Sequence, residues 1–127
     1  MNIKELSEKL HLDLSEKLKL DISRKQVQEI IGSLLREKPE LRQLLQNKKE
    51  FTKDDLKLVF ANLTSVKKID TKKFIKSYLS VCDFYSQGEN VKPLAYETVK
   101  LALFAYIILM IKISRKKNKL KKQDKIT

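Results

Sequence analysis

The side chains that most often perform acid, base or nucleophilic chemistry are scarce in this chain of 127 residues. His11 is its only imidazole and Cys82 its only thiol. Asp54 and Asp55 form a carboxylate pair, but adjacent residues point to different sides of a helix, and acids in a first turn favour the helix dipole. We expect His11 to be a solvated surface histidine and Cys82 to be a buried structural thiol. The sequence therefore predicts no catalytic residue and a protein that is not an enzyme.

Metal and cofactor sites are not predicted either. The cysteine and histidine do not form a set with the spacing of zinc ligands, and the carboxylates form no calcium-loop pattern. The only two glycines, Gly32 and Gly88, are not followed by the Lys-Ser or Lys-Thr pair of a phosphate-cradling loop. We therefore expect no metal, no cofactor and no small-molecule substrate.

One segment, from Leu14 to Ile31, resembles a helix-turn-helix, in which the second helix presents polar side chains to the major groove of DNA. Lys19 stands where the turn of that motif usually has glycine, and the link that follows is longer than the common spacing. The alternative is an amphipathic hairpin with a solvated charged face. The residues that the resemblance implies as contacts to bases or phosphates are Arg24, Lys25, Gln26 and Gln28.

Positive charge is concentrated in two regions. The net charge is +12, and residues 112–127, with eight basic and one acidic side chain, supply +7 of it. Residues 48–77, with nine basic and four acidic side chains, supply a further +5. The candidate anion contacts in the C-terminal region are Arg115, Lys116, Lys117, Lys119, Lys121 and Lys122. Those in the middle region are Lys67, Lys68, Lys72 and Lys73.

Lysine-rich surfaces bind phosphates through charge and counterion release, without reading sequence. We therefore expect a non-enzymatic accessory protein that contacts nucleic acid, DNA or RNA, or a nucleoprotein assembly, mainly through phosphates. The first alternative is a helical protein–protein interaction module, an adaptor or an immunity-type inhibitor, that binds an acidic partner. A further alternative is a membrane-associated protein that uses its apolar C-terminal helix and basic flank. A homo-oligomer is compatible with each of these.

The length of the apolar run at residues 101–111 argues against a membrane span. Eleven residues extend about 16 Å as a helix, whereas a bilayer requires about 20 apolar residues. A central helix that other helices enclose explains the run better. Residues 1–10 alternate charge with leucine instead of forming a signal peptide, so with a single cysteine we expect a cytoplasmic protein.

The elements that position these residues are predicted to be helices. Hydrophobic residues make up 42% and charged residues 35% of the chain, and only two glycines and two prolines occur, which favours helices over tight turns. The fold class is therefore all-α: a compact five- or six-helix bundle with a central hydrophobic C-terminal helix and a basic tail.

Capping signals and apolar spacing locate the individual helices. Ser23 with Gln26 and Thr52 with Asp55 have the spacing of capping boxes. The expected helices span about 23–37, 39–47, 53–63 and 70–88, with a first helix around Ile3 to Leu10 and a last one that begins at Pro93. The helix at 70–88 is expected to carry a wide apolar stripe made of Phe74, Ile75, Tyr78, Leu79, Cys82 and Tyr85.

The domain prediction is a single helical domain over residues 1–113, followed by a basic C-terminal tail over residues 114–127. Within the domain, residues 1–47 are rich in leucine and carry no aromatic side chain, so we expect them to form a helical layer. All nine aromatic residues lie between Phe51 and Tyr106, so we expect residues 51–113 to build an aromatic-containing core.

Overall fold

The computed structural model of the protein describes residues 3–47, 50–66, 68–86 and 95–126, of which residues 3, 95–96 and 117–126 are described for the backbone only. Within these ranges the chain forms six helices and no strand, as the all-α prediction required. The helices are α1 (Ile3–Glu16), α2 (Arg24–Glu37), α3 (Pro39–Asn47), α4 (Lys53–Thr64), α5 (Thr71–Ser86) and α6 (Ala95–Ile126). Gly88 and Pro93, which we expected at the end of α5 and the start of α6, lie outside the described residues.

Two helices begin with the capping boxes expected from the sequence. At the start of α2, the Ser23 hydroxyl accepts the Gln26 N–H at 3.1 Å, and the Gln26 side chain accepts the Ser23 N–H at 2.9 Å. Thr52 and Asp55 make the same reciprocal pair at the start of α4, at 3.2 and 2.9 Å. Each box satisfies two backbone N–H groups that have no partner inside the helix.

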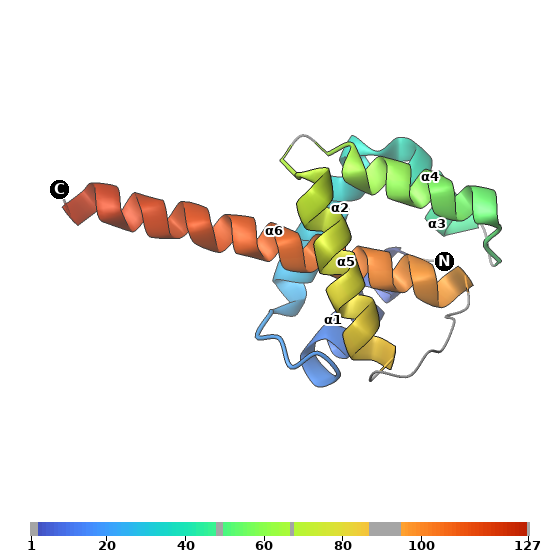
Figure 1. Cartoon of the computed structure of the whole chain (residues 1–127), viewed down its shortest axis with the longest axis horizontal. Coiled ribbons are helices and arrows are strands. Elements are labelled where there is room, and N and C mark those ends of the chain that lie inside the picture. The colour runs from blue at the N-terminus through green and yellow to red at the C-terminus, as the bar shows by residue number, and fades with distance from the viewer. Residues whose placement is uncertain (1–2, 48–49, 67, 87–94, 127) are drawn as a thin grey trace.

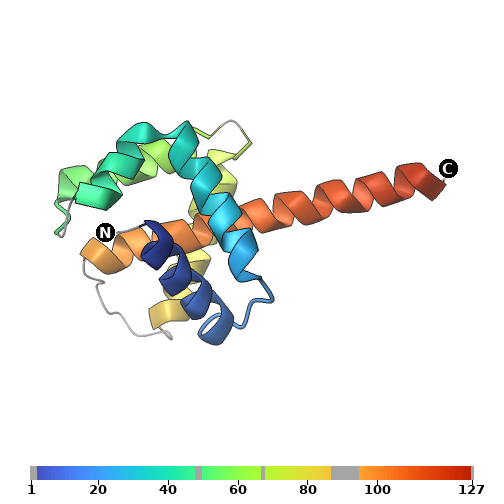
Figure 2. The ribbon, with the colours of Figure 1, turned by 180° about the vertical axis from the view of Figure 1, so that it is seen from behind.

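Helix α6 is the axis of the bundle, and α1, α2, α4 and α5 all pack against it. Figures 1 and 2 show it crossing the body between these helices. Leu103, Ala105 and Ile107 are completely buried. The predicted central hydrophobic C-terminal helix is therefore confirmed, and the apolar run at residues 101–111 lies mainly inside protein.

The core is one cluster that both halves of the chain build. Residues 1–47 contribute 11 of its 26 described hydrophobic residues, among them Leu10, Val27 and Ile31, which are completely buried. Aromatic side chains contribute less than their number suggests, because Phe84 and Tyr85 are exposed. The leucine-rich first third thus encloses α6 from one side.

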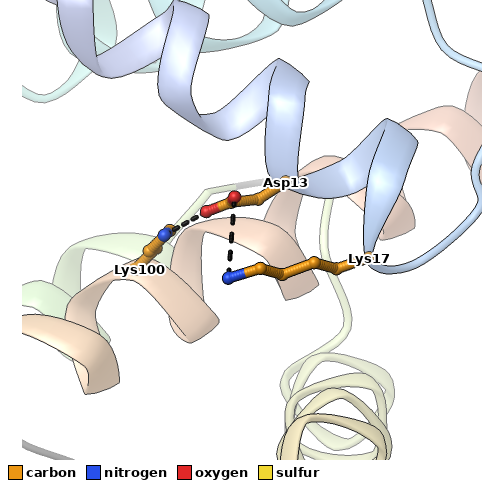
Figure 3. Close-up of polar contacts among 3 residues, drawn as sticks. All are labelled: Asp13, Lys17 and Lys100. Carbon is orange, nitrogen blue, oxygen red and sulfur yellow. Dashed lines mark ion pairs between the residues drawn. The ribbon is translucent and has the colours of Figure 1, made fainter.

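An ion pair joins α1 to α6 at the start of the apolar run. The Asp13 carboxylate pairs with the ammonium of Lys100 and, at 3.9 Å, with that of Lys17 (Figure 3). The side chains of Asp13 and Lys100 are 15% and 24% exposed, and Lys100 Nζ also lies 5.8 Å from the centroid of the Phe104 ring. The charge of Lys100, which directly precedes the apolar run, is therefore neutralised from α1.

Helix α5 differs from its predicted apolar stripe. Of the six stripe residues only Phe74 is buried, whereas Ile75, Leu79 and Tyr85 are exposed. The side of α5 that packs on α6 is centred on Phe74 and Val81. The stripe was placed wrongly because α5 has more apolar residues than one contact face can cover.

Candidate anion-binding surface

The C-terminal end of α6 carries most of the predicted anion contacts. Helix α6 continues without interruption from the core to Ile126, and this end projects away from the other helices in both views (Figures 1 and 2). Lys112, Arg115 and Lys116 are exposed on it. We call residues 112–126 the basic arm.

The helical backbone sets the register of the basic arm. Positions 112, 115, 116 and 119 have the spacing i, i+3, i+4 and i+7, which places them on one side of a helix. The side chains of four predicted contacts lie outside the described residues, although their backbone is helical: Lys117, Lys119, Lys121 and Lys122. The arm is thus a straight continuation of the buried axis, so the core holds its direction.

A second group of predicted contacts surrounds the start of α5. Lys68, Lys72 and Lys73 are all exposed, and Lys67 lies outside the described residues. The Asp70 carboxylate caps this end by accepting the Lys72 N–H at 2.8 Å. The first turn of α5 has no acidic residue, so its two lysines add to the positive end of the helix dipole. The Asp70 carboxylate offsets part of this positive charge, and the excess of three lysines over one aspartate attracts anions.

One lysine of this second group, Lys73, lines a groove that also reaches the first residue of the basic arm. Lys73 and Lys76 of α5 and Lys112 of α6 line the same hollow, which has a volume of about 440 Å³. Its apolar wall is formed by Leu18, Leu20, Val81, Phe84, Ile108 and Leu109. We call this hollow the α5–α6 groove. Among the residues described as lining it, lysines are the only charged ones.

A second hollow of about 350 Å³ shares part of its lining with the α5–α6 groove. Leu18, Val81 and Phe84 line both hollows, and the second one reaches Leu101 and Phe104 on α6. The packing that creates this shape includes a hydrogen bond of 3.4 Å, which the Ser77 hydroxyl donates to the Ala105 carbonyl. The two hollows are thus neighbours with a shared apolar wall, and Lys17 lines the second one.

The four residues implied by the helix-turn-helix resemblance are exposed at the start of α2: Arg24, Lys25, Gln26 and Gln28. The side chain of Gln26 is already used in the capping box with Ser23. Residues 17–23 connect α1 to α2, whereas the turn of the motif has roughly three or four residues. The geometry of this connection adds no support to a helix-turn-helix.

Lys25 and Gln28 instead line a separate hollow of about 520 Å³ between α2 and α3, together with Arg36 and Arg42. Glu29 lines the same hollow, so its charge is mixed. This hollow therefore attracts anions less strongly than a surface on which every charge is positive.

The groups with catalytic potential are buried to different degrees, and two of them make hydrogen bonds within the fold. The expectation of a solvated His11 is wrong, because its ring is half-buried and donates Nε2–H to the carbonyl of Ile22 at 3.0 Å. Asp55 is occupied by its capping box, and Cys82 is half-buried rather than buried. Burial, with a smaller contribution from Glu37, raises the pKa of Tyr106 to about 12.

The described part of the chain has neither a candidate metal site nor a candidate membrane span. There, histidine, cysteine and carboxylate side chains form no group of three that could hold a metal ion. None of the six helices, over the residues described, combines the length and apolar character that a bilayer crossing requires.

Two features of this surface were missing from the predicted contacts. Lys112 is not among the predicted anion contacts, and Phe84 is not part of the predicted α5 stripe. A weak signal for Phe84 existed in its spacing from Lys73, Lys76 and Ser80, which repeats every three or four residues. Comparisons of the chain with models of known protein families, with curated proteins and with solved structures found no match.

Proposed function

We propose that this protein is a non-enzymatic accessory protein that binds nucleic acid, or a nucleoprotein assembly, mainly through phosphate groups. The observation that carries the proposal is the continuity of α6, which extends from the core into the basic arm as one helix. Residues 112–127 hold eight basic side chains and one acidic one. An arm fixed in direction by the core presents this charge at a distance from the body.

The physical argument rests on counterion release. Each phosphate that a lysine or arginine neutralises frees a condensed counterion, which supplies affinity without any contact to a base. The major groove of DNA is wide enough to admit a helix, and phosphates border it on both sides. Lys68, Lys72 and Lys73 at the start of α5 add a second positive surface for the same backbone. We expect such binding to tolerate any nucleotide sequence.

The experiment measures affinity against salt concentration for the full chain, with arbitrary duplex and single-stranded DNA. A slope of log K against log salt of about −0.9 is expected for each phosphate neutralised on a duplex. The double variant Arg115→Gln and Lys116→Gln should flatten this slope by about 1.8. The readout is fluorescence anisotropy of a labelled oligonucleotide.

A matched control removes the same charge from α2. The double variant Arg24→Gln and Lys25→Gln should change the slope less, because Arg24 and Lys25 line hollows with α1 and α3 and not the hollow that α2 shares with Arg115. Equal flattening by both pairs, or no measurable binding of the unmodified protein at low salt, would refute the proposal. A loss of preference for one duplex sequence in the α2 variant would support the helix-turn-helix instead.

A further inference from the structure

The α5–α6 groove combines positive charge with an apolar wall, and a phosphate backbone would use only the first of these. Lys73, Lys76 and Lys112 supply positive charge, while six aliphatic or aromatic side chains supply an apolar wall. Sugar and phosphate groups gain little from contact with leucine and isoleucine, which offer them no hydrogen bond. The ligand that fits this groove is both anionic and strongly apolar.

Phe84 is a large apolar residue of this wall that stays exposed in the isolated chain. Its side chain is 55% exposed on α5, although burying a phenylalanine side chain contributes roughly 1.5–3 kcal/mol. It lies in both hollows, beside Leu18 and Val81. An exposed aromatic residue beside apolar neighbours and a charged rim is the arrangement found at protein interaction sites.

The length of the groove matches a short helix. Its lining along α5 runs from Lys73 to Phe84, and the eleven steps between them correspond to about 16 Å, or three helical turns. A helix laid into an apolar groove inserts side chains spaced i, i+3, i+4 and i+7. Carboxylates on either side of that apolar face would reach the lysines of the rim.

We propose that the α5–α6 groove docks an acidic amphipathic helix of a partner protein. Its apolar face packs on Leu18, Val81 and Phe84, and its carboxylates pair with Lys73, Lys76 and Lys112. This site goes beyond nucleic-acid binding by the basic arm, and either activity can exist without the other. In the complex, Phe84 becomes buried.

The test uses a labelled synthetic peptide long enough for about four helical turns, with leucines spaced i, i+3, i+4 and i+7 and glutamates on both flanks. Fluorescence anisotropy measures its binding to the full chain. Phe84→Glu and Lys76→Glu should each weaken binding by about tenfold or more, which corresponds to about 1.4 kcal/mol. Both residues are exposed, so circular dichroism should show an unchanged fold.

Lys57→Glu is the matched control, because it makes the same charge change at an exposed lysine of α4 outside the groove. It should leave peptide affinity within about twofold, a change of only ~0.4 kcal/mol. A peptide with lysines in place of glutamates should bind the Lys76→Glu variant better than the unmodified protein. A scrambled peptide of the same composition should bind weakly.

Three results would overturn this proposal. The first is equal weakening by Lys57→Glu and Lys76→Glu, which would indicate attraction to net charge alone. The second is equal binding of the scrambled peptide. The third is binding of phosphatidylglycerol vesicles, but not of the peptide, in a Phe84-dependent way, which would assign the groove to a membrane surface. A chain that ends at Lys116 lacks most of the basic arm but keeps the groove, so it should still bind the peptide. Failure of the nucleic-acid proposal can therefore be distinguished from failure of the groove proposal.

Discussion

At the scale of single residues, Lys19 has a backbone conformation that a residue with a side chain disfavours. Its φ of 54° lies in the left-handed region, which L residues other than glycine occupy at a cost of roughly 1–2 kcal/mol. The conformation turns the chain after α1, where the Leu20 N–H donates to the Leu14 carbonyl at 3.0 Å. Glycine, the residue that a tight turn favours, would adopt this conformation without a steric penalty.

Lys19→Gly should therefore stabilise the protein. The relief of strain is partly offset by the greater freedom of glycine in the unfolded chain, so we expect a net gain of about 0.5–1 kcal/mol in the free energy of unfolding. Urea denaturation followed by circular dichroism measures it. Lys19→Ala is the control, since it removes the charge but keeps Cβ, and it should give no gain. A loss of stability in Lys19→Gly would contradict the argument.

At the scale of elements, α6 has two segments with opposite requirements. Its apolar run is enclosed by α1, α2, α4 and α5, whereas its basic arm extends away from them (Figures 1 and 2). Lys100, which directly precedes the run, is paired with Asp13 of α1 (Figure 3). An unpaired charge farther along the run would have no such partner in α1.

Leu103→Asp should prevent folding of the bundle. Leu103 is completely buried, and an unpaired carboxylate in a core costs several kcal/mol, which is a large share of the stability of a domain this size. Leu103 is a better choice than Phe104, because Lys100 lies close enough to Phe104 to pair with a carboxylate introduced there. Far-UV circular dichroism and thermal unfolding of the purified protein give the readout.

Ser114→Asp is the control within the same helix, since Ser114 is exposed, and it should leave the unfolding temperature nearly unchanged. A folded, cooperatively unfolding Leu103→Asp variant would show that the apolar run is not the axis of the core in solution. Fractionation of that variant with membranes would favour the membrane-associated alternative.

At the scale of the whole molecule, the hydrophobic core that stabilises the fold and the lysines at the end of the basic arm lie in different parts of the chain. The core cluster ends within the apolar part of α6, and residues 117–127 carry five lysines and one aspartate. A chain that ends at Lys116 therefore has a net charge of +8 instead of +12. We expect its free energy of unfolding to differ by less than about 0.5 kcal/mol, as is usual for changes away from a core.

The same truncated chain should bind DNA with a flatter salt dependence, because fewer phosphates are neutralised. Chemical denaturation and anisotropy on one protein sample separate the two effects. A drop of several kcal/mol in stability would mean that the end of the arm packs on the body, and an unchanged salt dependence would move the phosphate contacts elsewhere.

Most of the fold could be predicted from local signals. The capping boxes at Ser23 and Thr52 located the starts of α2 and α4, and Pro39 located the start of α3. These signals work because a cap or a proline acts on backbone groups within one turn. The run at residues 101–111 identified the central helix, since apolar residues on every side require enclosure.

What the sequence by itself determined was therefore the set of helices, the buried axis and the +7 charge of the last sixteen residues. Only the tertiary structure decided that Lys73, Lys76 and Lys112 share one groove and that Phe84 is exposed in its wall. The physical reason is that α5 has apolar residues around most of its circumference, and the crossing of α5 and α6 selects which of them are buried. The spacing of apolar residues along one helix does not specify how that helix crosses another.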